Sequence, residues 1–119
     1  MIEKKVSIVG TGYVGLCTAV GFASRGYEVV ASTHDPEKAE LVNKGVPPFF
    51  EYGLEEMLQK VVKKGYLKCV LDREEAVLTT GITIISVSTP SQPDGSIDLR
   101  FIESSAREIG EMHACMLRR

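Results

Sequence analysis

A short apolar run leads directly into a glycine-rich turn near the start of this 119-residue chain. The run is VSIV at residues 6–9, and the turn reads Gly10-x-Gly12-x-x-Gly15 before a helix-like segment. In such an order of strand, turn and helix, the first glycine allows a tight turn and the second lets a diphosphate approach the backbone. The third lets the helix lie close to the strand, and the helix N-terminus offers unpaired N–H groups to an anion. We therefore predict a diphosphate-binding turn, with a glycine turn that binds no ligand as the alternative.

The remaining pattern alternates between strands and helices. We expect strands at residues 28–31, 66–71 and 82–87, and helices from residue 36, over residues 54–64, from residue 73 and from residue 99. Asp35-Pro36 predicts an N-cap with proline at the first helical position, and Asp72 with Glu75 resembles a capping box. The strand at residues 82–87 is apolar on both faces, which is typical of the middle of a parallel sheet. These elements predict a single α/β domain over residues 1–119, a Rossmann-type parallel sheet with helices on both faces.

Composition excludes several functional classes. Hydrophobic residues make up 44% and charged residues 25% of the chain, as in ordinary globular domains, and the net charge is −2. This charge gives no electrostatic reason to expect nucleic acid or an anionic membrane as a partner. No apolar run approaches the roughly 18 residues of a membrane span, and MIEKKV does not resemble a signal peptide. We expect a cytoplasmic protein.

The three cysteines do not form a recognisable site. Cys17, Cys69 and Cys115 are widely spaced and include no CxxC pair, so we expect reduced thiols and no metal site. Cys17 and Cys69 fall in a predicted helix and strand, where buried, inert thiols are expected. Cys115 lies close to a histidine and two methionines, which suggests a soft metal site, but one thiol and one imidazole do not complete a coordination sphere.

Three motifs together resemble a known family. GTGYVGL (residues 10–16), FEYGLEEML (residues 50–58) and VSTPSQPDGSIDL (residues 87–99) occur in the order and spacing of the UDP-glucose/GDP-mannose 6-dehydrogenases. The chain is similar to the N-terminal domain of that family over about residues 6–111. The resemblance implies oxidation of a nucleotide-sugar at C6 to a carboxylate by two hydride transfers to NAD, through a thiohemiacetal on a catalytic cysteine. It also implies a dimer built on a central helical segment and a C-terminal domain that binds the substrate nucleotide.

The resemblance also assigns a cofactor site. By motif match, the pyrophosphate would lie on Gly10, Thr11, Gly12, Tyr13, Val14 and Gly15. Lys38 would face the adenosine ribose. Ser88, Thr89 and Pro90 would line the cofactor at the end of the fourth strand. The strand-end position independently supports this last assignment, because ligands of open α/β sheets lie at the carboxyl ends of strands.

One departure from the family affects the choice of cofactor. The family usually ends its second strand with an aspartate that bonds the adenosine ribose, and Thr33 stands there instead. A carboxylate at this position favours NAD by repelling a 2′-phosphate. With Thr33, and with Ser32, His34 and Lys38 nearby, we expect NAD but leave NADP open. Asp35 either replaces the missing acid or only caps the following helix, and the N-cap is the commoner role.

A second departure concerns the family's YEPGL segment, which reads FEYGL at residues 50–54. The loop loses the fixed φ of proline where Tyr52 stands. Glu51 either faces the active-site side in a complete enzyme or is an early-helix acid stabilised by the helix dipole.

The chain ends after MHACMLRR, without the downstream threonine, glutamate, lysine-asparagine pair and cysteine of the family. We therefore assign no catalytic residue and expect the 119 residues alone to be inactive. The expected partners are a dinucleotide and, in the full-length family, a nucleotide-sugar, with a homo-oligomer left open. The alternatives are a free-standing dinucleotide-binding module without catalysis, or a folded remnant that binds nothing and self-associates through a sheet edge.

Overall fold

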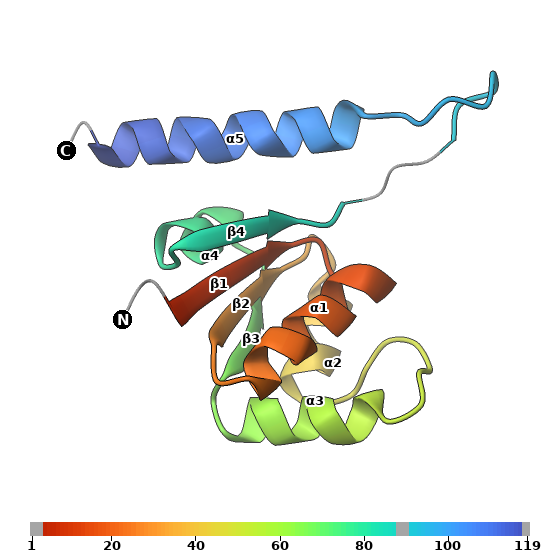
Figure 1. The fold of residues 1–119 in the computed structure, drawn as a ribbon, viewed down its shortest axis with the longest axis vertical. Helices are drawn as coiled ribbons and strands as arrows, with labels where there is room; N and C mark the ends of the chain where they lie inside the picture. The colour runs from red at the N-terminus through yellow and green to blue at the C-terminus, as the bar shows by residue number, and fades with distance from the viewer. Residues whose placement is uncertain (1–3, 88–90, 118–119) are drawn as a thin grey trace.

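A parallel four-stranded sheet with the strand order β3-β2-β1-β4 forms the centre of the protein (Figure 1). The structure is a computed structural model that describes residues 4–87 and 91–117. The strands are β1 (Lys5–Val9), β2 (Glu28–Ser32), β3 (Leu67–Val70) and β4 (Ile82–Ile85). The helices are α1 (Tyr13–Ser24), α2 (Pro36–Asn43), α3 (Leu54–Lys63), α4 (Arg73–Leu78) and α5 (Arg100–Leu117). The predicted Rossmann-type α/β fold is confirmed.

Helices cover both faces of the sheet, α1, α2 and α3 on one face and α4 and α5 on the other (Figure 1). Successive residues of a strand point to opposite faces, so each strand contributes to two layers. On the face of α1, Val6 and Ile8 belong to the main hydrophobic core, which also takes in buried residues of all three helices. On the opposite face the layer is more polar, and the hydroxyls of Ser7 and Thr83 are hydrogen-bonded at 2.7 Å.

The strand order reverses between β1 and β4. β1, β2 and β3 follow one another across the sheet, whereas β4 returns to the far side of β1. Val9 is in register with Ser32 of β2 and with Ile85 of β4, so the carboxyl ends of these strands meet at one edge of the sheet. In open α/β sheets a ligand site forms outside the carboxyl ends of the strands at such a reversal.

The connection from β1 into α1, which we call the glycine corner (residues 10–15), needs glycine at two positions. Gly10 has a φ of +102°, and a Cβ built on it would lie 2.2 Å from the Ser86 carbonyl oxygen. A Cβ built on Gly15, in the first turn of α1, would lie 2.2 Å from the Gly10 carbonyl oxygen. No side chain fits at either distance, so α1 and the segment after β4 both pack directly on the backbone of Gly10. The predicted tight turn and close helix are confirmed.

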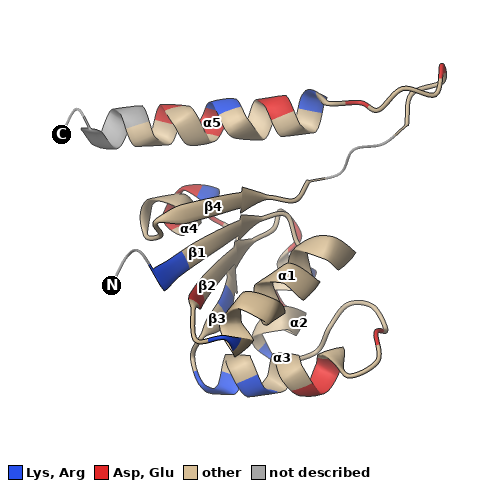
Figure 2. Ribbon diagram, in the orientation of Figure 1, with Lys and Arg blue, Asp and Glu red and all other residues tan. Residues whose placement is uncertain are grey.

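Local polar signals set where the other helices begin. Asp35 caps α2 and Asp72 caps α4, each by accepting a 3.0 Å hydrogen bond from the backbone N–H two residues later. Glu75, predicted to complete a capping box with Asp72, instead lies 3.7 Å from the Lys68 ammonium. In α3, acidic residues in the first turn and lysines in the last match the helix dipole, as Figure 2 shows.

Asp98 fixes the beginning of α5. Its buried carboxylate accepts a 3.0 Å hydrogen bond from the Arg100 backbone N–H and a 2.6 Å bond from the Arg100 guanidinium. These hydrogen bonds hold the pKa of Asp98 at about 2, below its ordinary value of 3.8. The helix therefore begins at Arg100, one residue after the predicted start.

Within the described residues, no helix is both long and apolar enough for a bilayer span.

The two edges of the sheet differ. The prediction that the strand at residues 82–87 lies in the middle of the sheet is wrong for the described part of the chain. There β4 pairs with β1 on one side and forms the edge, and Ile82 is 55% exposed. At the other edge, the Asn43 side-chain amide donates to the Cys69 carbonyl and accepts from the Cys69 N–H, both at 2.8 Å. Asn43 thus replaces a neighbouring strand at that residue of β3.

A pair of alanine substitutions in α1 tests the close packing at the glycine corner. Gly15→Ala places a methyl group against the Gly10 carbonyl, so we expect it to lower the free energy of unfolding by about 2–3 kcal/mol. Gly21 is exposed in the same helix, and a Cβ built on it would meet nothing within 4 Å. Gly21→Ala should therefore raise the free energy of unfolding by about 0.5–1 kcal/mol. Urea denaturation measures both, and equal effects of the two variants would contradict the packing described here.

Candidate functional site

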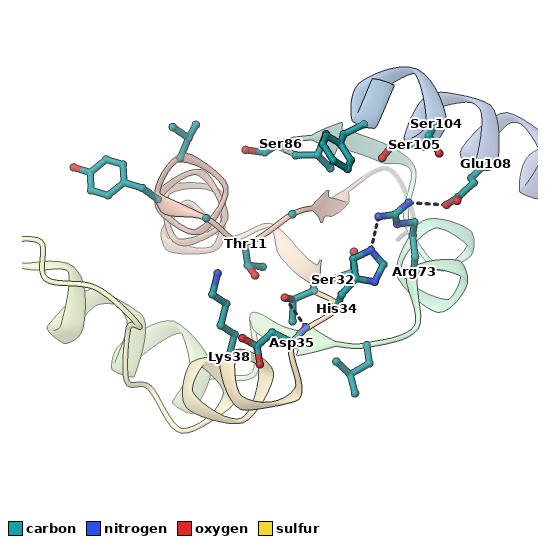
Figure 3. Close-up of a pocket in the computed structure, with 18 residues that line it drawn as sticks. Thr11, Ser32, His34, Asp35, Lys38, Arg73, Ser86, Ser104, Ser105 and Glu108 are labelled. Atoms are coloured by element: carbon teal, nitrogen blue, oxygen red, sulfur yellow. Dashed lines mark hydrogen bonds and ion pairs between the residues drawn. The ribbon is translucent and has the colours of Figure 1, made fainter. Parts of the chain in front are cut away.

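A cavity of about 760 Å³ lies over the carboxyl ends of the strands, and we call it the strand-end cavity (Figure 3). It is formed by elements that are far apart in the sequence. Its lining residues are Gly10, Thr11, Gly12, Tyr13 and Val14 of the glycine corner, Ser32 at the end of β2, Thr33, His34 and Asp35 after it, Lys38 of α2, Leu71 after β3, Arg73 of α4, Ser86 and Val87 after β4, and Phe101, Ser104, Ser105 and Glu108 of α5.

Most of the predicted cofactor residues line this cavity. Those that do are Gly10, Thr11, Gly12, Tyr13, Val14, Thr33, Asp35 and Lys38. Gly15 does not line the cavity but supports its floor through the contact with Gly10. Ser88, Thr89 and Pro90 lie outside the described residues.

Gly12 leaves open space above the backbone where α1 begins. A Cβ built on Gly12 would meet nothing within 4 Å, and Gly12 is the N-cap of α1 without a side-chain cap hydrogen bond. The first N–H groups of a helix have no intrahelical acceptor, and the helix dipole favours negative charge there. The position therefore offers an anion both room and hydrogen-bond donors.

Thr11 contributes an unusual buried polar atom. The residue is 4% exposed, and among the described residues its hydroxyl has no hydrogen-bond partner. In Figure 3 its side chain points into the same space as the Lys38 ammonium group. A buried hydroxyl without a partner costs about 1–3 kcal/mol, so a site that retains one has a reason other than stability. An acceptor oxygen of a bound ligand would satisfy the Thr11 hydroxyl.

The sequence left two roles open for the Asp35 carboxylate, a replacement for the acid missing at position 33 or an N-cap of the following helix. The N-cap role is confirmed, because Asp35 Oδ1 accepts from the Glu37 N–H, and the same residue also lines the strand-end cavity. Thr33, which stands where the family has an acid, accepts a 3.2 Å hydrogen bond from the Asp35 N–H through its hydroxyl oxygen. The turn after β2 is therefore held by its own side chains, with no carboxylate at position 33.

Arg73 is a site residue that the sequence analysis missed. Its guanidinium lies 3.1 Å from His34 Nε2 and 2.6 Å from Glu108 Oε2, and its side chain is 16% exposed (Figure 3). The signal that could have found it is the N-cap Asp72, which places the next residue at the carboxyl end of β3. Because β2 and β3 are adjacent and parallel, this end lies beside His34 at the end of β2.

The aromatic loop before α3 is bonded to the glycine corner. The Tyr13 hydroxyl donates a 2.5 Å hydrogen bond to Glu51 Oε2, and the rings of Tyr13 and Phe49 are 5.1 Å apart. The hydrogen bond to Glu51, aided by burial and the negative charge of that carboxylate, raises the pKa of Tyr13. Glu51 lies outside α3, ahead of the N-cap Gly53, so its interpretation as an early-helix acid is wrong.

The described thiols are poor nucleophiles. Cys69 is buried, and this burial raises its pKa to about 11. Cys17 is only half-buried, contrary to the prediction of a buried thiol, but burial and the charge of Glu51 raise its pKa as well. The side chain of Cys115 lies outside the described part of the structure. Within that part, no three histidine, cysteine or acidic side chains are grouped so that they could hold a metal ion.

A family model places the chain among known sequences. The model described as the UDP-glucose/GDP-mannose dehydrogenase family, NAD binding domain, matches residues 4–115. A GDP-mannose 6-dehydrogenase of Pseudomonas syringae pv. syringae is 43% identical over 106 residues, which are 89% of this chain and 24% of the relative. A UDP-glucose 6-dehydrogenase of Rhizobium meliloti is 39% identical over 88% of this chain and 24% of its own length.

Solved structures agree with these relatives. A UDP-glucose dehydrogenase from Pyrobaculum islandicum superposes with a TM-score of 0.87 at 43% identity, over 92% of this chain and 26% of that chain. A ternary complex of GDP-mannose dehydrogenase from Pseudomonas aeruginosa gives a TM-score of 0.84 at 41% identity, over 88% of this chain and 24% of that chain. The chain thus spans about a quarter of the length of the relatives it matches.

Two threonine-to-valine substitutions test whether Thr11 is kept for a reason other than stability. Thr11→Val removes an unpartnered hydroxyl, so we expect the free energy of unfolding to stay the same or rise by about 1 kcal/mol. Thr80 is also 4% exposed, but its hydroxyl donates a 3.0 Å hydrogen bond to the Ala76 carbonyl. Thr80→Val should lower the free energy of unfolding by about 1 kcal/mol. Urea denaturation distinguishes the two, and a clear loss of stability in Thr11→Val would count against the unpartnered state.

Proposed function

The chain belongs to the UDP-glucose/GDP-mannose dehydrogenase family, of which it carries the NAD-binding domain, and on that premise we propose that the strand-end cavity binds NAD(H). We further propose that the domain serves a nucleotide-sugar 6-dehydrogenase, in which a C6 alcohol is oxidised to a carboxylate in two hydride transfers. Relatives named as GDP-mannose and UDP-glucose 6-dehydrogenases support this reaction class.

The glycine corner is the proposed pyrophosphate site. Gly12 leaves room for the two phosphates, and the α1 N-terminus supplies N–H donors and the positive end of a dipole. The Thr11 hydroxyl would donate to a phosphate oxygen, and Lys38 lines the same cavity with a positive charge. The unpartnered Thr11 hydroxyl, buried in the cavity floor, is the single observation that best supports a bound ligand.

The remaining residues of the proposed site are assigned by the strand whose carboxyl end they follow. Tyr13, Val14 and the supporting Gly15 complete the glycine corner, while Thr33 and Asp35 lie at the end of β2, where the adenosine ribose of a dinucleotide is expected. Ser88, Thr89 and Pro90 are proposed to border the nicotinamide half, because they follow β4 on the other side of the strand-order reversal. When bound, NAD would supply the nicotinamide ring that accepts a hydride.

We propose that residues 1–119 act as a cofactor domain without turnover of their own. The reaction of the family passes through a thiohemiacetal, which requires a reactive thiolate. A thiol with a raised pKa is mostly protonated near pH 7 and is a weak nucleophile. Both Cys17 and Cys69 have raised pKa values, and neither lines the strand-end cavity.

Titration of the 119-residue chain with NADH tests the binding site. We expect saturable binding and at least a tenfold weaker dissociation constant for Gly12→Val, because the added side chain would occupy the open space above the backbone. Gly21→Val, in the exposed part of the same helix, is the matched control and should bind as the unchanged chain does. Calorimetry measures the affinities, and urea denaturation confirms that both variants fold. Undiminished binding by Gly12→Val would overturn the proposed pyrophosphate site.

Activity assays test the restriction to a cofactor role. With NAD and either UDP-glucose or GDP-mannose, we expect the purified chain to give no steady rise in absorbance at the wavelength of reduced nicotinamide. Steady reduction of NAD by the purified chain would contradict a purely cofactor-binding role. Tight NADH binding together with absent turnover would also be the behaviour of a free-standing dinucleotide-binding module.

A further inference from the structure

Three nitrogen-bearing side chains line the part of the strand-end cavity around the end of β2, where Arg73 contacts His34 and the Lys38 ammonium lies nearer to Thr11. Lys38 comes from α2, His34 from the turn after β2 and Arg73 from the first residue of α4 (Figure 3). They belong to three segments that the parallel order of β2 and β3 brings to one place. None of the three is explained by packing of the hydrophobic core, which lies on the α1 face of the sheet.

The end of β2 is the position at which dinucleotide folds distinguish a ribose hydroxyl from a ribose phosphate. A carboxylate there bonds the 2′-hydroxyl and repels a 2′-phosphate, whereas an arginine nearby accommodates the phosphate. Thr33 provides no such carboxylate, and its hydroxyl oxygen is engaged by the Asp35 N–H. The repulsive group that selects NAD is therefore absent from position 33.

Arg73 has the geometry of a phosphate ligand. Its contacts with His34 and Glu108 hold the guanidinium at the cavity wall, with a side chain that is 16% exposed. A guanidinium carries five N–H donors in a planar fork that matches phosphate oxygens, and the two contacts leave donors free. His34, which accepts from Arg73 through Nε2, orients the guanidinium, while Lys38 supplies a second full positive charge in the same cavity.

Two carboxylates, Asp35 and Glu108, also line this end, and their negative charges oppose a bound anion. Asp35 faces the Glu37 N–H as an N-cap, so part of its negative charge is already compensated by a helix terminus. Glu108 is paired with Arg73 at 2.6 Å, and its side chain is 48% exposed. Because the Glu108 side of this ion pair is about half exposed, a phosphate of about two negative charges can displace Glu108 toward solvent.

We propose that this end of the strand-end cavity accepts the 2′-phosphate of NADP(H), with Arg73 as its principal ligand and Thr33 as the residue that permits it. The chain then binds NADPH about as well as NADH. This inference rests on the proposed function, since it needs a dinucleotide whose pyrophosphate lies on the glycine corner. Beyond the proposed function, the inference specifies which class of dinucleotide the cavity accepts where the adenosine ribose would lie.

Parallel titrations with NADH and NADPH separate this inference from the function on which it rests. The chain contains no tryptophan, so the fluorescence of the reduced nicotinamide reports binding without indole emission. We expect a dissociation constant for NADPH within about tenfold of that for NADH. Binding of NADH with NADPH more than about tenfold weaker overturns the 2′-phosphate site but not the proposed function. Binding of neither cofactor overturns both.

A substitution of Arg73 tests whether this residue is responsible for the binding of NADPH. Arg73→Gln should weaken NADPH binding about tenfold or more, since hydrogen bonds to charged groups are lost, and should change NADH binding less than about threefold. Arg107→Gln is the matched control, because Arg107 is exposed on α5 and does not line the cavity, and it should leave both affinities within about twofold. An equal loss of both cofactors in Arg73→Gln would overturn the assignment.

Thr33→Asp gives an independent measurement that does not remove a contact of Arg73. Restoring a carboxylate at the end of β2 should weaken NADPH binding by about tenfold or more and leave NADH binding unchanged or tighter. Thermal unfolding of each variant checks that the fold is retained. Retention of full NADPH affinity by Thr33→Asp would contradict the proposed placement of the 2′-phosphate beside position 33.

Discussion

Three backbone segments meet at Gly10 more closely than any side chain would allow. A Cβ on Gly10 would lie 2.2 Å from the Ser86 carbonyl oxygen, and a Cβ on Gly15 would lie equally close to the Gly10 carbonyl oxygen. This contact brings the end of β1, the segment after β4 and the first turn of α1 together at one point. The floor of the strand-end cavity and the direction of the α1 N-terminus both depend on it. The third glycine, Gly12, has a different role, because it leaves space empty for a ligand instead of allowing close packing.

The two ends of the strand-end cavity use different chemistry. Around the glycine corner, the proposed recognition of an anion relies on main-chain groups and one threonine hydroxyl, which depend on the fold and vary little with side-chain identity. At the end of β2, the proposed recognition of a 2′-phosphate relies on the side chains of Thr33, His34 and Arg73. In this proposal, the general ability to hold a dinucleotide is separable from the choice between dinucleotides. A few substitutions at the second end can alter that choice without disturbing the sheet.

Sequence reasoning succeeded where the determinants are local and failed where they are not. The caps by Asp35 and Asp72 and the glycine turn involve residues a few positions apart, so spacing alone identifies them. The edge position of β4 could not be predicted from its apolar sequence. Apolar residues on both sides of a strand indicate that its two faces can be buried, but they do not indicate how many strands pair with it. The contact of Arg73 with His34 joins residues 39 positions apart. It becomes visible only when β3 is placed beside β2.

The same limit applies to the aromatic loop. The hydrogen bond between Tyr13 and Glu51 spans 38 positions, and each residue taken alone had a plausible local role. The family motif identified both segments but said nothing of their contact. Because Tyr13 lies in the first turn of α1 and lines the strand-end cavity, this bond ties the loop before α3 to the glycine corner.

The side chain of Asn43 has a consequence for how this sheet can be extended. By satisfying both backbone groups of Cys69, it occupies the hydrogen-bonding sites that a fifth strand would need at the outer side of β3. Among the described residues, the opposite border along β4 has no such blocking amide at its exposed Ile82. Growth of the sheet, whether by more of the same polypeptide or by another molecule, is therefore favoured along β4, since Asn43 hinders it at Cys69 of β3. That side is the one farthest from the site where the adenosine half of a dinucleotide is proposed to lie.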